Sequence, residues 1–141
     1  MAMTIHLSIV SPETEIFSGR ATRVFARGVM GELEIAPFHA PLLTLLLPGP
    51  VRYRRQNEED EYVYVSGGIL EVQPDIVTVL ADVVVRAKDI DEAEALKAKE
   101  RAEEMLRDKQ TDFDISLARA ELARAAGMLR ALKELRRHVK G

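Results

Sequence analysis

The side chains able to perform acid–base, nucleophilic or metal chemistry lie far apart in this sequence. Its three histidines are His6, His39 and His138, and none has a second ligand at the short spacing that metal sites use. The chain has no cysteine, which excludes thiol nucleophiles, thiolate metal sites and disulfides. The sequence also has no Gly-x-Ser-x-Gly nucleophile motif, phosphate loop or dinucleotide fingerprint. It therefore predicts a chain without an active site, metal or cofactor of its own.

Two polar clusters have structural interpretations. We interpret residues 66–68 (SGG) as a β-hairpin turn rather than an anion cradle, since glycine pairs are typical of tight turns. The carboxylates of residues 89–104 are interpreted as the solvated face of a helix rather than an acid–base pair.

Basic residues near the C-terminus form the most distinctive pattern. At about 100° per residue, a helix places five of them in one stripe beside an apolar seam. These are Arg119, Arg130, Lys133, Arg137 and Lys140. The stripe is either a solvated helix face or a surface that docks on an acidic protein, with Leu129 and Leu132 burying beside the charges. Nucleic acid is disfavoured as a partner because the net charge is −3 and no aromatic residues interleave with the cations.

Composition indicates a small folded chain. It has 141 residues, of which 47% are hydrophobic, and this excludes wholesale disorder. No signal peptide is expected, because the start lacks a basic region followed by an apolar segment. The longest apolar run, residues 41–48, is far shorter than the roughly 20 residues of a membrane helix. Any membrane association is therefore expected to be indirect, through a partner.

Residues 1–87 are predicted to form an all-β domain. Residues 4–10 alternate, which places Ile5, Leu7 and Ile9 on one face. Residues 62–65 and 76–80 also read as strands, and glycine- and proline-rich turns separate the runs. Short strands without intervening helices predict an antiparallel sandwich or barrel.

Residues 88–141 are predicted to form a second, helical domain. Helices are expected at 90–107, capped by Asp89, and at 113–139, capped by Thr111 or Asp112. A short polar link predicts an antiparallel hairpin. The predicted seams are Ala95, Ala98, Ala102 and Met105 on the first helix, and Ile115, Ala118, Leu122, Ala125, Leu129 and Leu132 on the second. Because alanine buries little area, the hairpin should be weakly held and able to open.

Three segments resemble the epsilon subunit family of rotary ATP synthases. They are residues 31–44 (GELEIAPFHAPLLT), residues 65–74 (VSGGILEVQP) with 77–82 (VTVLAD), and residues 91–95 (DEAEA) with 98–104 (AKERAEE). The resemblance covers nearly the whole chain. It implies an N-terminal β-sandwich and a C-terminal helical hairpin, as the residue pattern also predicts.

The resemblance also implies a function. The chain would be a non-catalytic, central-stalk subunit of a proton-translocating ATP synthase, peripheral to the cytoplasmic face of a bacterial inner membrane. It would couple the gamma subunit to the c-subunit ring and inhibit ATP hydrolysis in the alpha/beta catalytic head through its C-terminal helices.

By the same resemblance, two sets of residues are candidates for partner contacts. Glu32, Phe38 and His39 match loops that face the c ring or gamma. Arg119, Leu129, Arg130, Leu132, Lys133 and Arg137 match the segment that approaches the catalytic head. For His39 the alternative is a turn residue bonded to nearby backbone, and the two interpretations are compatible.

Two glycines of the family pattern are replaced here, by Glu34 and Phe38. If these positions need positive φ, each substitution should cost stability. Alternatively the turn has changed shape, and Phe38 is an exposed apolar contact toward the ring or gamma.

Some relatives bind ATP between the sandwich and the hairpin through an arginine at a position that is Glu94 here. A carboxylate would repel phosphate. Asp91, Arg101 and Arg124 remain candidates for weak ATP binding, so an ATP-responsive subunit stays an alternative. A third hypothesis is a free-standing adaptor that oligomerises through a coiled coil of residues 113–139.

Overall fold

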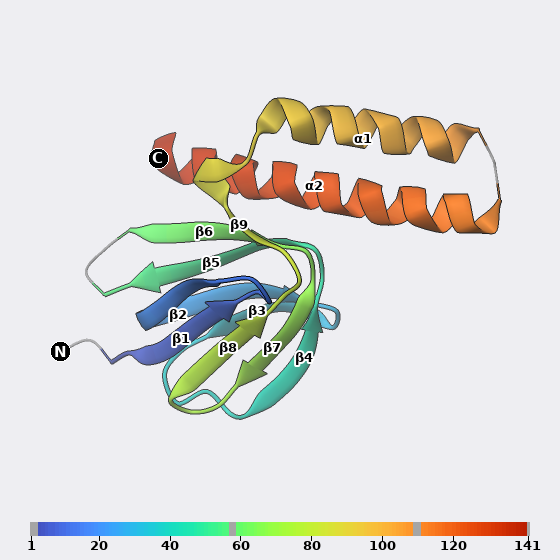
Figure 1. Ribbon diagram of the computed structural model, residues 1–141. Helices are drawn as coiled ribbons and strands as arrows, with labels where there is room; N and C mark the ends of the chain where they lie inside the picture. Colours follow the sequence, from blue (N-terminus) through green and yellow to red (C-terminus); the bar gives the residue numbers. More distant parts are fainter. Residues whose placement is uncertain (1–2, 57–58, 109–110, 141) are drawn as a thin grey trace.

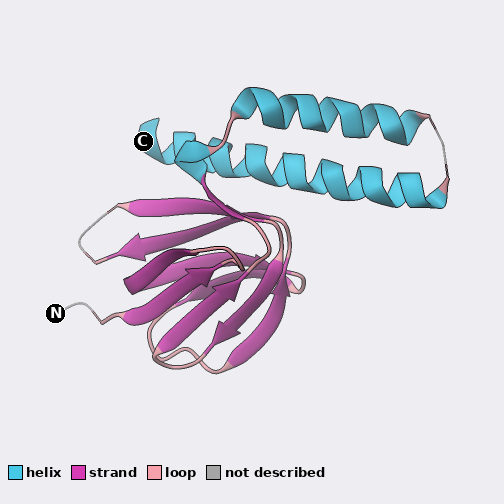
Figure 2. Ribbon diagram, viewed as in Figure 1, coloured by secondary structure: helices cyan, strands magenta, loops and turns pink. Residues whose placement is uncertain are grey.

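The computed structural model describes residues 3–56, 59–108 and 111–140, and their side chains up to residue 137. Strands form one part of the molecule and two long helices the other, with α2 lying across one side of the strand domain (Figures 1 and 2). The predicted fold class, a β-sandwich followed by an antiparallel helical hairpin, is confirmed. The side chains of His138 and Lys140 lie outside the described residues.

Within the described residues, nine strands build the sandwich. They are β1 (Ile5–Val10), β2 (Glu15–Gly28), β3 (Gly31–Ile35), β4 (Leu42–Leu46), β5 (Gly49–Arg55), β6 (Asp60–Val65), β7 (Gly68–Val72), β8 (Ile76–Leu80) and β9 (Val84–Arg86). Their order is β1-β8-β7-β4-β2-β5-β6-β9, with β3 pairing beside β2. The long strand β2 also pairs with β1, so it belongs to both layers and closes the sandwich on itself.

The described strands pair antiparallel, as predicted, except at one place. β1 and β8 pair in parallel, with His6 opposite Ile76 and Val10 opposite Leu80. These strands are separated by most of the domain. Their relative direction is therefore set by the route of the chain around the sandwich and not by a local turn.

The interpretation of residues 66–68 as a hairpin turn was also wrong. β6 pairs with β5 and β9, whereas β7 pairs with β4 and β8, so the segment crosses between layers. Gly68 has φ +140°, and a Cβ there would lie 2.0 Å from the carbonyl oxygen of Leu80. Glycine is required by this close backbone approach.

Alternation in the strands places the core as predicted. Ile5, Leu7 and Ile9 are at most 1% exposed and pack in one cluster with Val63 and Val65 of β6. The other face of β6 presents two tyrosines, Tyr62 and Tyr64, to the helices. Both faces of β6 are thus buried, as a strand with two apolar faces predicts.

A 3₁₀ turn, η1 (Ala87–Asp89), leads into the hairpin of α1 (Glu92–Arg107) and α2 (Asp112–Lys140). Asp91, not Asp89, caps α1, accepting a hydrogen bond from the backbone N–H of Glu94 at 3.2 Å. Residues 87–89 are used by η1, so the helix begins later than predicted. Thr111 caps α2 as expected, accepting from the N–H of Asp114 at 3.2 Å.

Alanines hold the two helices together. Ala95 and Ala102 of α1, and Ala118 and Ala125 of α2, are at most 4% exposed. Met105, predicted in the seam, is 37% exposed near the end of the hairpin. Alanine side chains contribute little apolar area, and a weakly held hairpin stays a prediction.

Candidate partner-binding surfaces

A second apolar row on α2, missed in the sequence, docks the hairpin on the sheet. Met128, Ala131 and Leu135 pack against Tyr62, Tyr64 and Ala87, and Ala131 is fully buried. The spacing of 128, 131 and 135 repeats at three and four residues and was a readable signal. The row lies beside the seam toward α1, so one helix has two apolar faces.

Gly127 marks the point where α2 approaches the sheet most closely. A Cβ at this position would lie 2.8 Å from Cε1 of Tyr64 and 3.2 Å from the backbone nitrogen of Gly49. The first distance is shorter than any ordinary carbon–carbon contact. A glycine inside a long helix, which costs about 1 kcal/mol relative to alanine, was the sequence signal for this contact.

Ion pairs join α2 to the rest of the chain in this docked position. Both guanidinium Nη atoms of Arg136 donate to the carboxylate of Glu92 in α1, at 3.0 and 2.6 Å. These bonds hold the pKa of Glu92 below its ordinary value. Nη2 of Arg130 lies 3.7 Å from Oε1 of Glu32, which links α2 to β3.

The Arg130–Glu32 pair brings together residues that were predicted to contact different partners. Arg130 was a candidate for the catalytic head and Glu32 for the c ring. Arg130 also lies 3.7 Å from Glu134, one helical turn away. In the docked hairpin these charges are directed toward one another, so Arg130 is shared between folding and any partner contact.

The other predicted head-binding residues divide into two groups. Arg119, Lys133 and Arg137 are exposed. Leu132 is 7% exposed and Leu129 is half-buried. Both leucines share the helix face of Arg136, which pairs with α1. The cations are accessible in this conformation, Leu129 is accessible in part, and Leu132 becomes accessible only when α2 separates from α1.

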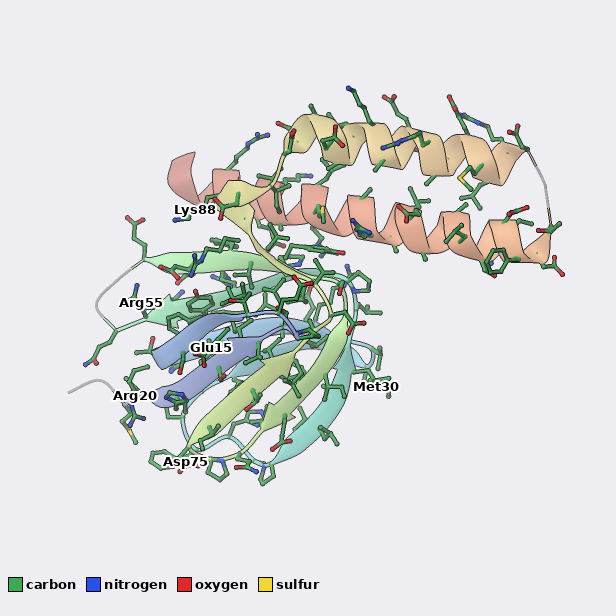
Figure 3. All side chains as sticks on the ribbon, in the orientation of Figure 1. Glu15, Arg20, Met30, Arg55, Asp75 and Lys88 are labelled. Carbon is green, nitrogen blue, oxygen red and sulfur yellow. The ribbon has the colours of Figure 1, made fainter. Side chains whose placement is uncertain are left out.

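Phe38 and His39 occupy the turn after β3, away from Glu32. Figure 3 shows the neighbouring β7–β8 turn, labelled at Asp75, and the β2–β3 turn, labelled at Met30, at separate places on the sandwich. The N–H of Phe38 donates to the carbonyl of Pro74 at 2.9 Å, which fastens the turn to that end of β7. The structure therefore does not gather the three predicted ring-facing residues at one site.

The structure shows which of the two replaced glycine positions needs a positive φ. Phe38 has φ +67° and is 69% exposed, so its position favours glycine and its ring projects outward. Glu34 lies in the extended strand β3, 3.7 Å from Arg23, and needs no positive φ. The ring of His39 lies 2.7 Å from the carbonyl oxygen of Ala40, through Nδ1. The backbone-bonded interpretation of His39 is thus confirmed, and its partner contact stays a prediction.

An apolar surface patch, which the sequence did not reveal, covers the outer face of β4, β7 and β8. Leu45 lies opposite Ile69, and Ile69 lies opposite Leu80, so the three form a row across the strands. Leu43 adds to the row on β4. These side chains are between 40% and 69% exposed, whereas α2 contacts β5 and β6. We call Leu43, Leu45, Ile69 and Leu80 the apolar patch; a contiguous group of this kind is typical of a protein-binding surface.

A cleft of about 330 Å³ between the helices and β9 contains the three candidate ATP residues. Asp91, Arg101 and Arg124 all line it. The same walls carry further carboxylates, namely Asp89, Glu94 and Glu121. Two cations therefore face four carboxylates, an unfavourable balance for a polyphosphate.

Two further findings concern the described part of the chain. Among the described side chains, in residues 3–56, 59–108 and 111–137, no three histidine, aspartate or glutamate side chains come together as metal ligands. Neither helix within these ranges is both long and apolar enough to cross a membrane.

The chain is a β-sandwich with a docked helical hairpin, and its exposed apolar patch is typical of a surface that binds another protein. The family model described as ATP synthase, Delta/Epsilon chain, beta-sandwich domain matches residues 4–87. The model described as the long alpha-helix domain of the same chains matches residues 88–133. An ATP synthase epsilon chain from Nitrosococcus oceani is 54% identical over 137 residues, covering 97% of this chain and 98% of the relative.

Solved structures of low identity show the same fold. A chain in the Euglena gracilis mitochondrial ATP synthase (OSCP/F1/c-ring) has a TM-score of 0.74 at 18% identity, covering 96% of this chain and 81% of that one. A chain in the central stalk/c-ring of the Tetrahymena thermophila enzyme has a TM-score of 0.61 at 16% identity, covering 92% and 97%.

This chain belongs to the ATP synthase delta/epsilon chain family. Within that family it is an epsilon subunit, a non-catalytic component of the ATP synthase complex.

Proposed function

We propose that this subunit couples gamma to the c-subunit ring in the central stalk and inhibits ATP hydrolysis through its C-terminal helices. Its place would be peripheral, at the cytoplasmic face of a bacterial inner membrane. The observation that carries the proposal is the arrangement of α2. Its cations Arg119, Lys133 and Arg137 are exposed to solvent. The docking of α2 on the sheet depends on the small residues Gly127 and Ala131.

The coupling role is supported by surfaces of the sandwich that the hairpin leaves uncovered. The apolar patch on β4, β7 and β8 suits a stable contact with an apolar face of gamma. The turn at Phe38 and His39 projects an aromatic ring at another edge and suits the c ring. Two separate surfaces on one rigid sandwich are what a connecting subunit requires.

The inhibitory role is supported by residues that change availability when the hairpin opens. Release of α2 from the sheet frees Arg130 from Glu32, and separation of α2 from α1 exposes Leu132. Together these changes add a cation and an apolar anchor to the exposed Arg119, Lys133 and Arg137. An acidic surface on the catalytic head would attract the cations and bury the leucine.

The test is ATP hydrolysis by the purified alpha/beta/gamma head with and without the full chain. We expect inhibition by the wild type, and loss of most of it when Arg119, Lys133 and Arg137 are replaced by alanine. A matched control replaces three cations of α1, namely Lys97, Lys99 and Arg107, and should keep the inhibition. Equal inhibition by both triple variants would refute the role of the basic α2 face.

Coupling has its own measurement in inverted membrane vesicles. Removing residues 89–141 should leave ATP-driven proton pumping, because the apolar patch and the Phe38 turn are retained. Pumping lost with the truncation would contradict a coupling role confined to the sandwich. Hydrolysis unchanged by the truncation would contradict the inhibitory role.

We further propose that the cleft at Asp91, Arg101 and Arg124 is not an ATP sensor at cellular nucleotide concentrations. Four carboxylates line it, among them Glu94 of α1. Calorimetric titration of the full chain with ATP and magnesium tests this, and dissociation constants of millimolar or below would overturn it. The Glu94→Arg variant should then bind more tightly than the wild type.

A further inference from the structure

The hydroxyl of Tyr64 is buried beneath α2 without a hydrogen bond. Tyr64 is 0% exposed, and its oxygen has no donor or acceptor partner among the described residues. Burial raises the pKa of this phenol to about 12, so it stays neutral at physiological pH. A buried polar group without a hydrogen-bond partner is rare in native proteins. It destabilises the fold, because the group has lost the hydrogen bonds that it makes to water when exposed.

This burial is caused by the hairpin. Tyr64 stands on the face of β6 that packs with Ala131 of α2, and Gly127 places the helix backbone directly over its ring. The lateral neighbours of Tyr64 on the sheet are Pro50 of β5 and Val85 of β9, and both are main-chain register partners. When α2 leaves the sheet, the side of the ring that contacted α2 and the hydroxyl become exposed to solvent.

The contact therefore combines a favourable term with an unfavourable one. The close approach at Gly127 buries apolar surface of the ring and stabilises docking. The unpaired hydroxyl opposes docking, because it regains hydrogen bonds to water only in the released state. A phenylalanine would keep the first term and remove the second.

We propose that the Tyr64 hydroxyl is a release element: it weakens docking of α2 on the sheet and keeps the hairpin close to the point of opening. The proposed inhibition of hydrolysis gives this device its use, but the docking equilibrium itself is independent of that function. Gly127 is the counterpart that makes docking possible at all. Together they set the ratio of docked to released hairpin.

The experiment measures that ratio in the full chain. Because the chain has no cysteine, labels attach only where cysteines are introduced, at the exposed residues Asp75 of the sandwich and Glu121 of α2. The distance between spin labels is followed during urea titration, so that both states are populated. Circular dichroism checks that each variant retains its strands and helices.

Tyr64→Phe should raise the docked-to-released ratio about tenfold, within a range of roughly fivefold to a hundredfold. Gly127→Ala should lower the ratio, because the added Cβ meets Tyr64 and Gly49. The control is Ala126→Gly, which exchanges the same two residue types in the opposite sense at an exposed position of α2. It should leave the docked-to-released ratio within about twofold of wild type.

An unchanged or lowered ratio in Tyr64→Phe overturns the proposal, since the hydroxyl would then have a partner such as a bound water. Hydrolysis assays on the same variants separate this from the proposed function. If Tyr64→Phe raises docking tenfold while inhibition of the catalytic head does not change, the release element stands and the inhibitory role of the hairpin fails.

Discussion

Replacing Ala131 by aspartate is expected to detach α2 from the sheet while the sandwich stays folded. Ala131 is 0% exposed in the cluster with Tyr62, Tyr64 and Ala87. Nothing else in that cluster carries a charge, so a carboxylate there would be buried without a partner. Either the helix must then leave the sheet, or the introduced carboxylate must be protonated.

The magnitude follows from the size of the docking contact. Full burial of a large apolar side chain stabilises by about 1.5–3 kcal/mol, and Met128 and Leu135 are only partly buried. With Ala131, docking on the sheet amounts to roughly 3–4 kcal/mol before side-chain ordering is subtracted. An unpaired buried carboxylate costs several kcal/mol. A net change of about 4 kcal/mol alters the docked-to-released ratio roughly a thousandfold, which makes release the dominant state.

The assay uses a thiol introduced at Met128, which is half-buried on the side of α2 that faces the sheet. Its rate of modification by a neutral reagent reports how often α2 leaves the sheet. Ala126→Asp is the matched control, since it adds the same charge and the same helix-propensity cost at an exposed position. Labelling in Ala131→Asp that is no faster than in Ala126→Asp would refute the reasoning. Unfolding of the sandwich in Ala131→Asp would refute the independence of the two parts.

Three further predictions concern other parts of the chain. Phe38→Gly should stabilise the protein by about 0.5–1 kcal/mol in urea unfolding, because glycine relieves the left-handed φ of +67° at a small entropic cost in the unfolded chain. The Glu92–Arg136 pair should hold the helix ends together above the ordinary pKa of a glutamate and be lost as pH falls through its lowered pKa, as seen by the distance between labels on the two helices. Leu45→Asp should leave the unfolding free energy within about 0.5 kcal/mol, since Leu45 is 58% exposed, but it should abolish binding to gamma in a pull-down with the purified head.

Each of these predictions has a control within the chain. Glu34→Gly should destabilise, because Glu34 lies in an extended strand, and a gain equal to that of Phe38→Gly would contradict the strain argument. Glu92→Gln should flatten the acid dependence of the helix distance, and an unaltered profile would assign it to other carboxyls. Ile76→Asp, at the exposed first residue of β8, should retain gamma binding, and equal loss in both variants would disprove a localised patch.

Local patterns predicted the strands and helices well, because apolar residues repeat with one characteristic period in a strand and another in a helix. The alternation at Ile5, Leu7 and Ile9 identified the buried face of β1, and the alanine spacing identified the seam between α1 and α2. Thr111 was recognisable as a cap since its partner, the N–H of Asp114, is three residues away. The family motifs then specified the subunit, because they extend along most of the chain.

Pairings between distant residues were beyond the sequence. Nothing local indicates that β1 runs parallel to β8 or that residues 66–68 cross between layers. The apolar patch depends on the register of β4, β7 and β8, which brings Leu45, Ile69 and Leu80 into one row. For Phe38 the expected positive φ was found, and for Glu34 it was not, because strand pairing with β2 decides the second case.

The connection between sandwich and hairpin limits how the helices can travel. Residues 87–91 separate the last strand from α1, and Ala87 among them is itself buried beneath α2. Five residues drawn out fully span at most about 17 Å, which is the longest tether available to an intact hairpin. For α2 to move farther from the sandwich, α1 and α2 must separate, and the length of α1, roughly 24 Å, is then added to that of the linker. Whether the alanine seam is closed or open therefore determines how far from the sandwich α2 is able to act.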